Sequence, residues 1–242
     1  MNSRSSVIGF RFALFLAVTV LMFSQTGYSQ QVLQLRPNIQ TFPASDLAVA
    51  TTATGGKEIR FTTMTWNSGN GKLELWAGET GPAGQNVYQR VYLDNGTYFD
   101  NLAGTFEYHA AHMHFHFEDY AFYSLQPVNA PGASQRTGQK TTFCLMDTTK
   151  VNTRLPGAPN KPFYGGCGDV TQGMSVGWGD RYGSYLEGQS IDITGNPDGL
   201  YRLIIDADPE NRLLETDDSD NASCVLVSIT GFTAIPQGSC TT

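Results

Sequence analysis

Two stretches, EIRFTTMTW (58–66) and KLELWAG (72–78), stand on either side of SGNG (68–71). The first is rich in β-branched and aromatic residues and the second alternates apolar with polar residues, which is typical of strands. Gly and Asn between two such runs favour a hairpin turn. Similar runs recur along the chain, separated by Gly, Pro, Asn and Asp; they cover 85–93, 105–109, 112–125, 141–148, 189–194, 201–208 and 223–232. We therefore predict an all-β fold, an antiparallel β-sandwich with long functional loops, of which the Gly-rich stretch 149–188 is the longest.

The first 29 residues have the features of a secretory signal peptide. Arg4 and Arg11 make the start basic, and an apolar stretch, ALFLAVTVLMF (13–23), follows. Small residues precede the cleavage point that we predict after Ser29. The alternative is an N-terminal membrane anchor, for which the apolar stretch is short. We expect a signal peptide over 1–29, one domain over 30–242, and a secreted or extracytoplasmic protein without membrane attachment after cleavage.

The net charge of the chain limits the classes of molecule that we expect it to bind. The formal net charge is −7, and it becomes −9 without the first 29 residues, which hold two arginines and no acid. An acidic protein is a poor ligand for nucleic acid and suits a cationic partner. Simple solubility explains the charge equally well, so the charge excludes nucleic acid more firmly than it identifies a partner.

Four cysteines follow the predicted cleavage point, at positions 144, 167, 224 and 240. An even number in an oxidising compartment predicts two disulfides, and three pairings are open. We choose the nearest-neighbour pairing, Cys144–Cys167 and Cys224–Cys240. The spacing is unlike that of a zinc site.

All four histidines of the chain lie within HAAHMHFHFED (109–119). In a strand, alternate side chains share one face, so His112, His114 and His116 would point one way, with Met113 and the next two phenylalanines directed to the core. The outer two Cα atoms would be about 13 Å apart, at about 3.3 Å per residue, which three inclined imidazoles can span around one ion.

Neutral imidazole suits copper, zinc, iron or nickel, so the pattern predicts a metal without choosing it. His109 adds a fourth nitrogen nearby, which we expect to support the site from outside the set of ligands. Three unrelated surface histidines are the alternative, and the concentration of every histidine in one stretch argues against it.

Four segments together resemble the catalytic domain of the lysyl oxidase family. FEYHAAHMHFHFEDYAFYSL resembles the family's copper-binding segment, and GQKTTFCLMDT resembles the segment in which a lysine lies four residues before a cysteine. GDRYGSYLEGQSIDIT resembles its DxYG segment, and LLETDDSDNASCVLV its C-terminal acidic stretch. The matches run in the same order from about residue 100 to 240. The chain has fewer cysteines than the animal members, and residues 149–179 diverge from them.

The resemblance implies specific roles for residues of this chain. It assigns His112, His114 and His116 to copper, and Lys140 and Tyr182 to the self-derived cofactor lysine tyrosylquinone. Such chemistry needs an electron acceptor that ordinary side chains lack. A tyrosine beside copper and O₂ can be oxidised to a quinone, to which a neutral lysine amine can add.

Two further roles are less determined by the sequence. The base that removes a proton from the substrate is open among Asp119, Asp180 and Asp192, and we choose Asp119 because it ends the histidine segment. Asp217 and Asp220 belong to ETDDSDN (215–221), where short spacing of carboxylates suits calcium. A solvated turn is the simpler interpretation, although the resemblance implies a structural calcium there.

Two functions remain for testing. The resemblance implies a secreted copper- and quinone-dependent amine oxidase that uses O₂ to deaminate peptidyl lysine or other primary amines, with release of an aldehyde, H₂O₂ and NH₃. The alternative is a non-enzymatic extracellular metal-binding β-sandwich used for adhesion or metal capture. In that case Lys140 and Tyr182 would be ordinary surface residues, and no bond would join them.

Overall fold

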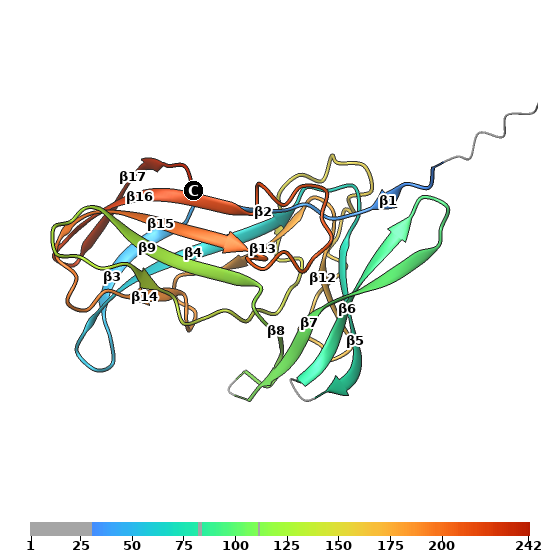
Figure 1. The fold of residues 1–242 in the computed structure, drawn as a ribbon, viewed down its shortest axis with the longest axis horizontal. Helices are drawn as coiled ribbons and strands as arrows, with labels where there is room; N and C mark the ends of the chain where they lie inside the picture. Colours follow the sequence, from blue (N-terminus) through green and yellow to red (C-terminus); the bar gives the residue numbers. More distant parts are fainter. Residues whose placement is uncertain (1–30, 82–83, 111) are drawn as a thin grey trace, which may run out of the picture. The chain divides into compact units, whose positions relative to one another are not determined.

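The computed structural model describes residues 31–81, 84–110 and 112–242, so the predicted signal peptide, 1–29, lies outside the described residues. Val32–Thr242 forms one compact unit. Its regular elements are strands, and every pairing between them is antiparallel, which confirms the predicted all-β class (Figure 1). Nowhere in these ranges is there a helix of the length and apolarity needed to cross a membrane.

The strands form three sheets. The first has the order β12-β5-β6-β7-β8, with β1 added to β6; its strands are β1 (Gln34–Leu35), β5 (Leu73–Gly81), β6 (Gly84–Leu93), β7 (Tyr98–His109), β8 (His114–Phe117) and β12 (Thr171–Met174). The second has the order β10-β9-β15-β16-β17; its strands are β9 (Ala121–Asn129), β10 (Arg136–Thr137), β15 (Gly199–Ala207), β16 (Ala222–Thr230) and β17 (Thr233–Ser239). The third is built on β4; its strands are β2 (Ile39–Thr41), β3 (Ser45–Thr51), β4 (Lys57–Asn67), β11 (Thr149–Lys150), β13 (Trp178–Tyr182) and β14 (Ser190–Asp192).

The second and third sheets pack face to face and enclose the main core (Figure 1). Alternation along β4 directs Ile59 and Phe61 inward, where the Phe61 ring meets the edge of the Tyr123 ring from β9 at 5.2 Å between centres. Leu203 of β15 and Val227 of β16 belong to the same core, and all five side chains are at most 1% exposed. Burying side chains of this size contributes about 1.5–3 kcal/mol each.

The hairpin predicted at SGNG (68–71) is wrong. The two flanking runs do form β4 and β5, but these strands belong to different sheets. The N–H of Gly71 donates a hydrogen bond to the carbonyl of Arg36, 2.8 Å away, so a distant segment runs across the turn. A β-carbon at Gly69 would lie 2.4 Å from the Arg36 carbonyl oxygen, and one at Gly71 would lie 2.1 Å from that of Leu35. These glycines allow a close approach of backbones rather than a tight hairpin.

The single strand predicted over 112–125 is also wrong. The structure divides it into β8 and β9, and His112 lies in a turn before β8. Met113 and Asp119 have φ values of 56° and 54°, a left-handed conformation that interrupts strand alternation. Met113 is consequently 80% exposed, against the prediction that it points into the core.

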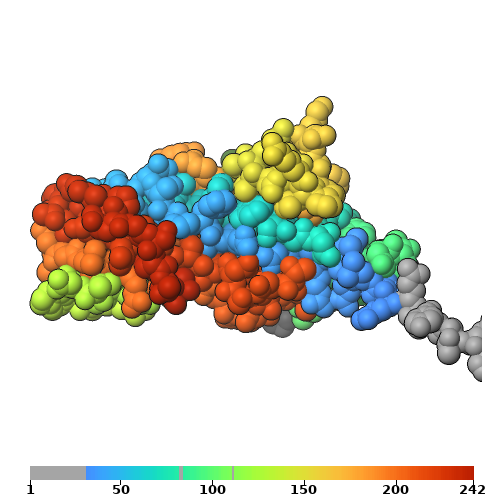
Figure 2. All heavy atoms as spheres, turned by 90° about the horizontal axis from the view of Figure 1, so that it is seen from above, coloured from blue at the N-terminus to red at the C-terminus, as the bar shows by residue number. Residues whose placement is uncertain are grey.

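The predicted disulfides, Cys144–Cys167 and Cys224–Cys240, are confirmed. The long stretch 149–188 carries three short strands, β11, β12 and β13, within otherwise irregular chain. Around residues 150–160 it forms a raised part of the surface, coloured yellow in Figure 2. The run 141–148 is not a strand of any sheet, because only Phe143 forms a bridge, with Phe117 of β8.

Candidate active site

One cavity of about 420 Å³ lies where three parts of the chain meet. The first is the turn and strand β8, the second is the irregular segment 140–148, and the third is β13 with the turn after it. The Cys144–Cys167 disulfide forms part of the wall. The cavity is lined by His112, His114, His116, Lys140, Cys144, Met146, Thr148, Cys167, Asp180, Arg181, Tyr182, Leu186 and Glu187.

Three of the four histidines line this cavity, and the fourth, His109, packs against two of them. His109, the last residue of β7, stacks on His112 at 4.2 Å between ring centres and on His116 at 4.9 Å. Each of these three offers a ligand nitrogen, and the three nitrogens lie within 4.8 Å of one another. His114 joins through its Nε2, which is 2.8 Å from Nε2 of His116.

This arrangement differs from the predicted set in one respect. His112 and His116 belong to it as expected, and His109, which the sequence placed outside the ligands, brings a nitrogen as close to theirs as one ion requires. The reason is the left-handed turn at Met113, which removes His112 from the strand and folds it back towards the end of β7. The N–H of His112 donates to the carbonyl of His109, 3.0 Å away, which links the two residues directly.

The histidine cluster fits a metal ion by its donor chemistry. Nδ1 of His109 is buried and has no hydrogen-bond partner among the described residues. Nδ1 of His116 lies 3.1 Å from the hydroxyl of Thr142, which fixes the ring so that Nε2 faces the other histidines. Burial, followed by the nearby Lys140 charge, lowers the pKa of His116 to about 3, and burial also lowers the pKa of His114. Neutral imidazole is the form that binds copper or zinc.

Lys140 and Tyr182 face each other in the same cavity. Tyr182 ends β13, where it is paired with Thr63 of β4, and its hydroxyl donates to the carbonyl of Cys144 at 2.6 Å. Nζ of Lys140 lies 5.6 Å from the centre of the Tyr182 ring and 4.9 Å from that of Phe143. Burial lowers the pKa of the Lys140 amine and raises that of the Tyr182 phenol well above its ordinary value.

Comparison with known proteins adds to this geometry. A family described as "Lysyl oxidase" matches residues 98–237, which is more than half of the chain and includes every side chain of the cavity. The chain belongs to the lysyl oxidase family. It is 33% identical to human lysyl oxidase homolog 1 over 128 residues, which are 52% of this chain and 21% of that protein. It is 31% identical to human protein-lysine 6-oxidase over 135 residues, 55% of this chain and 30% of that protein, and 31% identical to the pig protein-lysine 6-oxidase, of which it covers 51%. The chain thus spans from about a fifth to about half of these relatives.

The three aspartates considered for a base lie in different places in this lysyl oxidase relative. Asp119 is on an exposed turn, 3.5 Å from the guanidinium of Arg212, and does not line the cavity. Asp192 is exposed and accepts hydrogen bonds from Thr194. Asp180 lines the cavity, and burial raises its pKa to about 7.

Asp180 is held firmly in its buried position. Its carboxylate accepts hydrogen bonds from the Met146 N–H at 3.2 Å and from the Thr148 hydroxyl at 3.1 Å. Since side chains two apart on a strand share a face, Asp180 and Tyr182 both point from β13 towards the segment around Cys144. The sequence named Asp180 as a candidate, but only the structure separates it from Asp119.

The acidic stretch at the C-terminal side is remote from this chemistry. Asp217 accepts hydrogen bonds from the N–H and hydroxyl of Ser219, and Asp220 accepts from Asn38 and Gln40. In the described part of the chain, only the histidines bring three ligand atoms of separate residues close enough for one ion. These contacts suit a solvated turn, and calcium at Asp217 and Asp220 stays a prediction.

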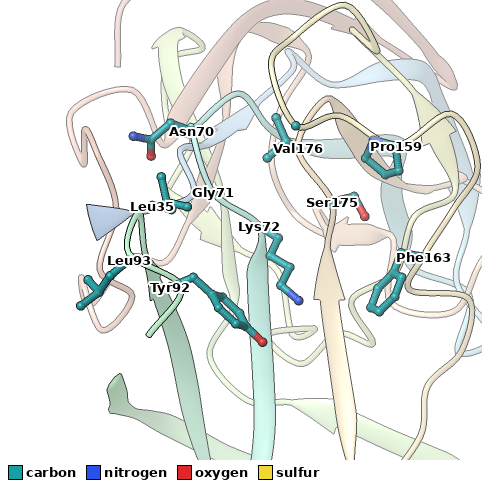
Figure 3. A pocket seen from close by; sticks show the side chains of 12 residues that line it. Leu35, Asn70, Gly71, Lys72, Tyr92, Leu93, Pro159, Phe163, Ser175 and Val176 are labelled. Atoms are coloured by element: carbon teal, nitrogen blue, oxygen red, sulfur yellow. The ribbon is translucent and has the colours of Figure 1, made fainter. Parts of the chain in front are cut away.

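A second cavity, of about 490 Å³, is lined mostly by apolar residues and is drawn in Figure 3. The amine of Lys72 stands 4.5 Å from the centre of the Tyr92 ring and 5.3 Å from that of Phe163. That amine binds the buried carboxylate of Glu74, which also accepts hydrogen bonds from Tyr92 and Tyr164. The only titratable groups that line this second cavity, Lys72 and Tyr92, both contact Glu74. The first cavity, called the histidine cavity below, is therefore the better candidate for catalysis.

Sequence reasoning did not select Glu187 or Met146, which also line the histidine cavity. Met146 lies in the segment quoted for its lysine and cysteine, and Glu187 follows Tyr182 in a turn. Neither belongs to a spacing pattern that predicts chemistry.

Proposed function

We propose that this chain is a secreted copper- and quinone-dependent amine oxidase that acts on peptidyl lysine or other primary amines. The net reaction consumes one amine, one O₂ and one water, and releases one aldehyde, one NH₃ and one H₂O₂. The observation that carries the proposal is the position of the Lys140 amine beside the Tyr182 ring, in a cavity that is lined by His112, His114 and His116.

Copper and the quinone would supply the electron-accepting chemistry that unmodified side chains lack. His109, His112 and His116 are the residues that would hold the ion, with His114 as the fourth nitrogen. Lys140 and Tyr182 are the residues that would be joined as lysine tyrosylquinone, as the family resemblance implies.

The protein's own contribution is to bring Lys140 to the ring in a reactive form. Burial of its amine lowers the pKa, so that the neutral, nucleophilic form is more accessible than at a solvated lysine. The hydrogen bond from the Tyr182 hydroxyl to the Cys144 carbonyl fixes one edge of the ring. Packing on Phe143, with ring centres 5.0 Å apart, restrains it further.

Asp180 is the residue that we propose as proton acceptor, in place of Asp119. It would take the proton from the carbon next to the substrate nitrogen. It lines the cavity and has a pKa of about 7, and a base works best when its pKa lies near the working pH.

The remaining expectations concern the setting of the enzyme. Two disulfides suit an oxidising, extracytoplasmic compartment. Residues 30–242 would be the catalytic domain, and the acidic net charge would favour lysine-containing protein substrates over nucleic acid.

A peptide map of copper-loaded, air-exposed protein tests the proposal. We expect a species in which the peptides that carry Lys140 and Tyr182 are linked, together with peroxide release from an added amine. Tyr182→Phe should abolish both, whereas Tyr185→Phe, at an 80% exposed position in the next turn, should retain both. Two unlinked peptides and no peroxide would instead support the metal-binding module.

A further inference from the structure

Glu187 stands at the boundary between the histidine cavity and a smaller one. The neighbouring cavity, of about 210 Å³, is lined mainly by polar groups. Three residues line both cavities: His112, Lys140 and Glu187. Oε2 of Glu187 lies 3.4 Å from Nε2 of His112, yet the Glu187 side chain is 77% exposed. Its carboxylate therefore faces solvent at the entrance to the site.

The turn that carries Glu187 is fixed by its own hydrogen bonds. The Leu186 N–H donates to the carbonyl of Gly183 at 2.9 Å. The guanidinium of Arg60 on β4 donates to the carbonyls of Ser184 and Leu186, each at 2.7 Å. Glu187 thus lies on a turn that is held by hydrogen bonds.

The other charged groups that line the cavity are paired with another residue or buried. The guanidinium of Arg181 binds Asp46 at 2.8 Å. Asp180 is buried and accepts hydrogen bonds from Met146 and Thr148. Lys140 would lose its free ammonium on joining Tyr182. Of the charged side chains that line the cavity, Glu187 is the one anion open to solvent.

We propose that Glu187 binds the ammonium group of an incoming alkylamine at the entrance and so selects cationic substrates. This proposal rests on the proposed oxidase function. A primary amine such as a lysine side chain arrives protonated, because its ordinary pKa is about 10.4. Beyond Glu187, the walls formed by Leu186, Met146 and the disulfide suit the methylene groups of such a chain. A bound metal ion would repel the cation, so an anion at the entrance is needed to attract it.

A binding experiment tests Glu187 without turnover. Zinc-loaded Lys140→Met protein, which holds no redox-active ion and no amine at position 140, is the background in which n-butylammonium and 1-butanol, the neutral molecule of similar shape, are titrated. We expect Glu187→Gln to weaken n-butylammonium binding by up to about fivefold, the upper end for an exposed ion pair, and to leave 1-butanol unchanged. Glu79→Gln removes the same charge at an exposed site on β5 outside the cavity, and it should behave as the Lys140→Met background does.

Turnover provides the second measurement. With copper, Glu187→Gln should raise KM for n-butylamine by about the same factor and leave kcat within about twofold. Unchanged binding of n-butylammonium, or an equal loss for both ligands, would overturn the proposal. A fall in zinc affinity would also overturn it, because it would make Glu187 a metal ligand. Absence of turnover in the wild type would reject the oxidase function alone, since the zinc titration would still decide on Glu187.

Discussion

The amine of Lys140 lies 5.6 Å from the centre of the Tyr182 ring, although the two residues come from separate parts of the chain. Lys140 reaches this position from the irregular segment after β10, and Tyr182 from the end of β13. The fold therefore places side by side the two side chains that we propose as the precursors of lysine tyrosylquinone.

Replacing Lys140 by methionine should prevent the cross-link and remove quinone staining. The methionine keeps an unbranched side chain of similar length and lacks the nucleophilic amine. Lys150→Met is the matched control, because the Lys150 amine also lies 5.6 Å from an aromatic ring, that of Trp178, but outside the cavity. Redox-cycling stain of the denatured protein and peptide mass measure the effect. Staining of the Lys140 variant at the wild-type level would exclude this lysine from the cofactor.

The histidine variants should distinguish the grouping of His109, His112 and His116 from the predicted ligand set of His112, His114 and His116. Loss of a ligand should weaken zinc binding by at least about 100-fold, more than loss of an orienting group, which costs about 10–100-fold. We expect His109→Ala and His116→Ala each to weaken zinc binding at least about 100-fold. Thr142→Val, which removes the contact to His116, should weaken it by about 10–100-fold. Competition with a chelator measures the affinities.

Met113→Ala supplies the control for that series, because Met113 lies between two histidines and is 80% exposed. It should bind zinc as the wild type does. If His109→Ala did the same, His109 would return to the outer role that the sequence suggested.

Asp180→Asn should flatten the dependence of stability on pH in the metal-free protein. Burial raises the pKa of Asp180 from 3.8 to about 7, so the folded state holds a proton that the unfolded chain releases. The stabilisation is complete below about pH 3.8 and is lost as the pH rises through about 7, on the order of 4 kcal/mol in total. Asparagine can accept from the Met146 N–H and donate to the Thr148 hydroxyl, so both contacts are kept.

Urea unfolding between about pH 4 and pH 8 measures this effect. Asp192→Asn is the control of opposite sign, because hydrogen bonds from Thr194 lower the pKa of that exposed carboxylate. A slope in Asp180→Asn equal to that of the wild type would show that Asp180 does not titrate in this range.

Gly188→Ala should impair the site beyond its effect on the backbone. Gly188 has φ +74°, and a β-carbon there would lie 2.8 Å from Cβ of Lys140. We expect a loss of about 1–2 kcal/mol from the left-handed conformation, together with a displaced Lys140 and less cross-link. Gly132→Ala is matched in conformation, with φ +85° and no heavy atom within 4 Å, so it should show the stability loss alone. Peptide mass gives the yield of cross-link, and equal yields in the two variants would contradict the steric argument.

Strand periodicity was enough to predict the class of the fold but not how the strands associate. The runs 58–66 and 201–208 became β4 and β15 because alternation of side chains is a local property. The partners of β4 depend on the segment that crosses Gly69 and Gly71, which is distant in sequence. No local pattern encodes such a crossing.

The sequence predicted which residues form the site better than it predicted how those residues are arranged. Concentration of histidines and the family resemblance identified Lys140, Tyr182 and the cluster; Lys140, Tyr182 and three of the histidines line one cavity, and His109 stacks on two of those histidines. The approach of His109 to His112 and His116 accompanies a left-handed residue, Met113, which strand alternation does not anticipate. The separation of Asp180 from Asp119 depends on burial, which is a tertiary property.

The Cys144–Cys167 disulfide lies within the stretch of chain that a Lys140–Tyr182 bond would close. Thiol reagents would cleave the disulfide and leave the Lys140–Tyr182 bond intact. The reduced and fully denatured polypeptide would therefore still contain a covalently closed loop from residue 140 to residue 182. It would run faster in a denaturing gel than the same polypeptide without the bond. A single proteolytic nick between residues 140 and 182 would leave one connected molecule instead of two fragments.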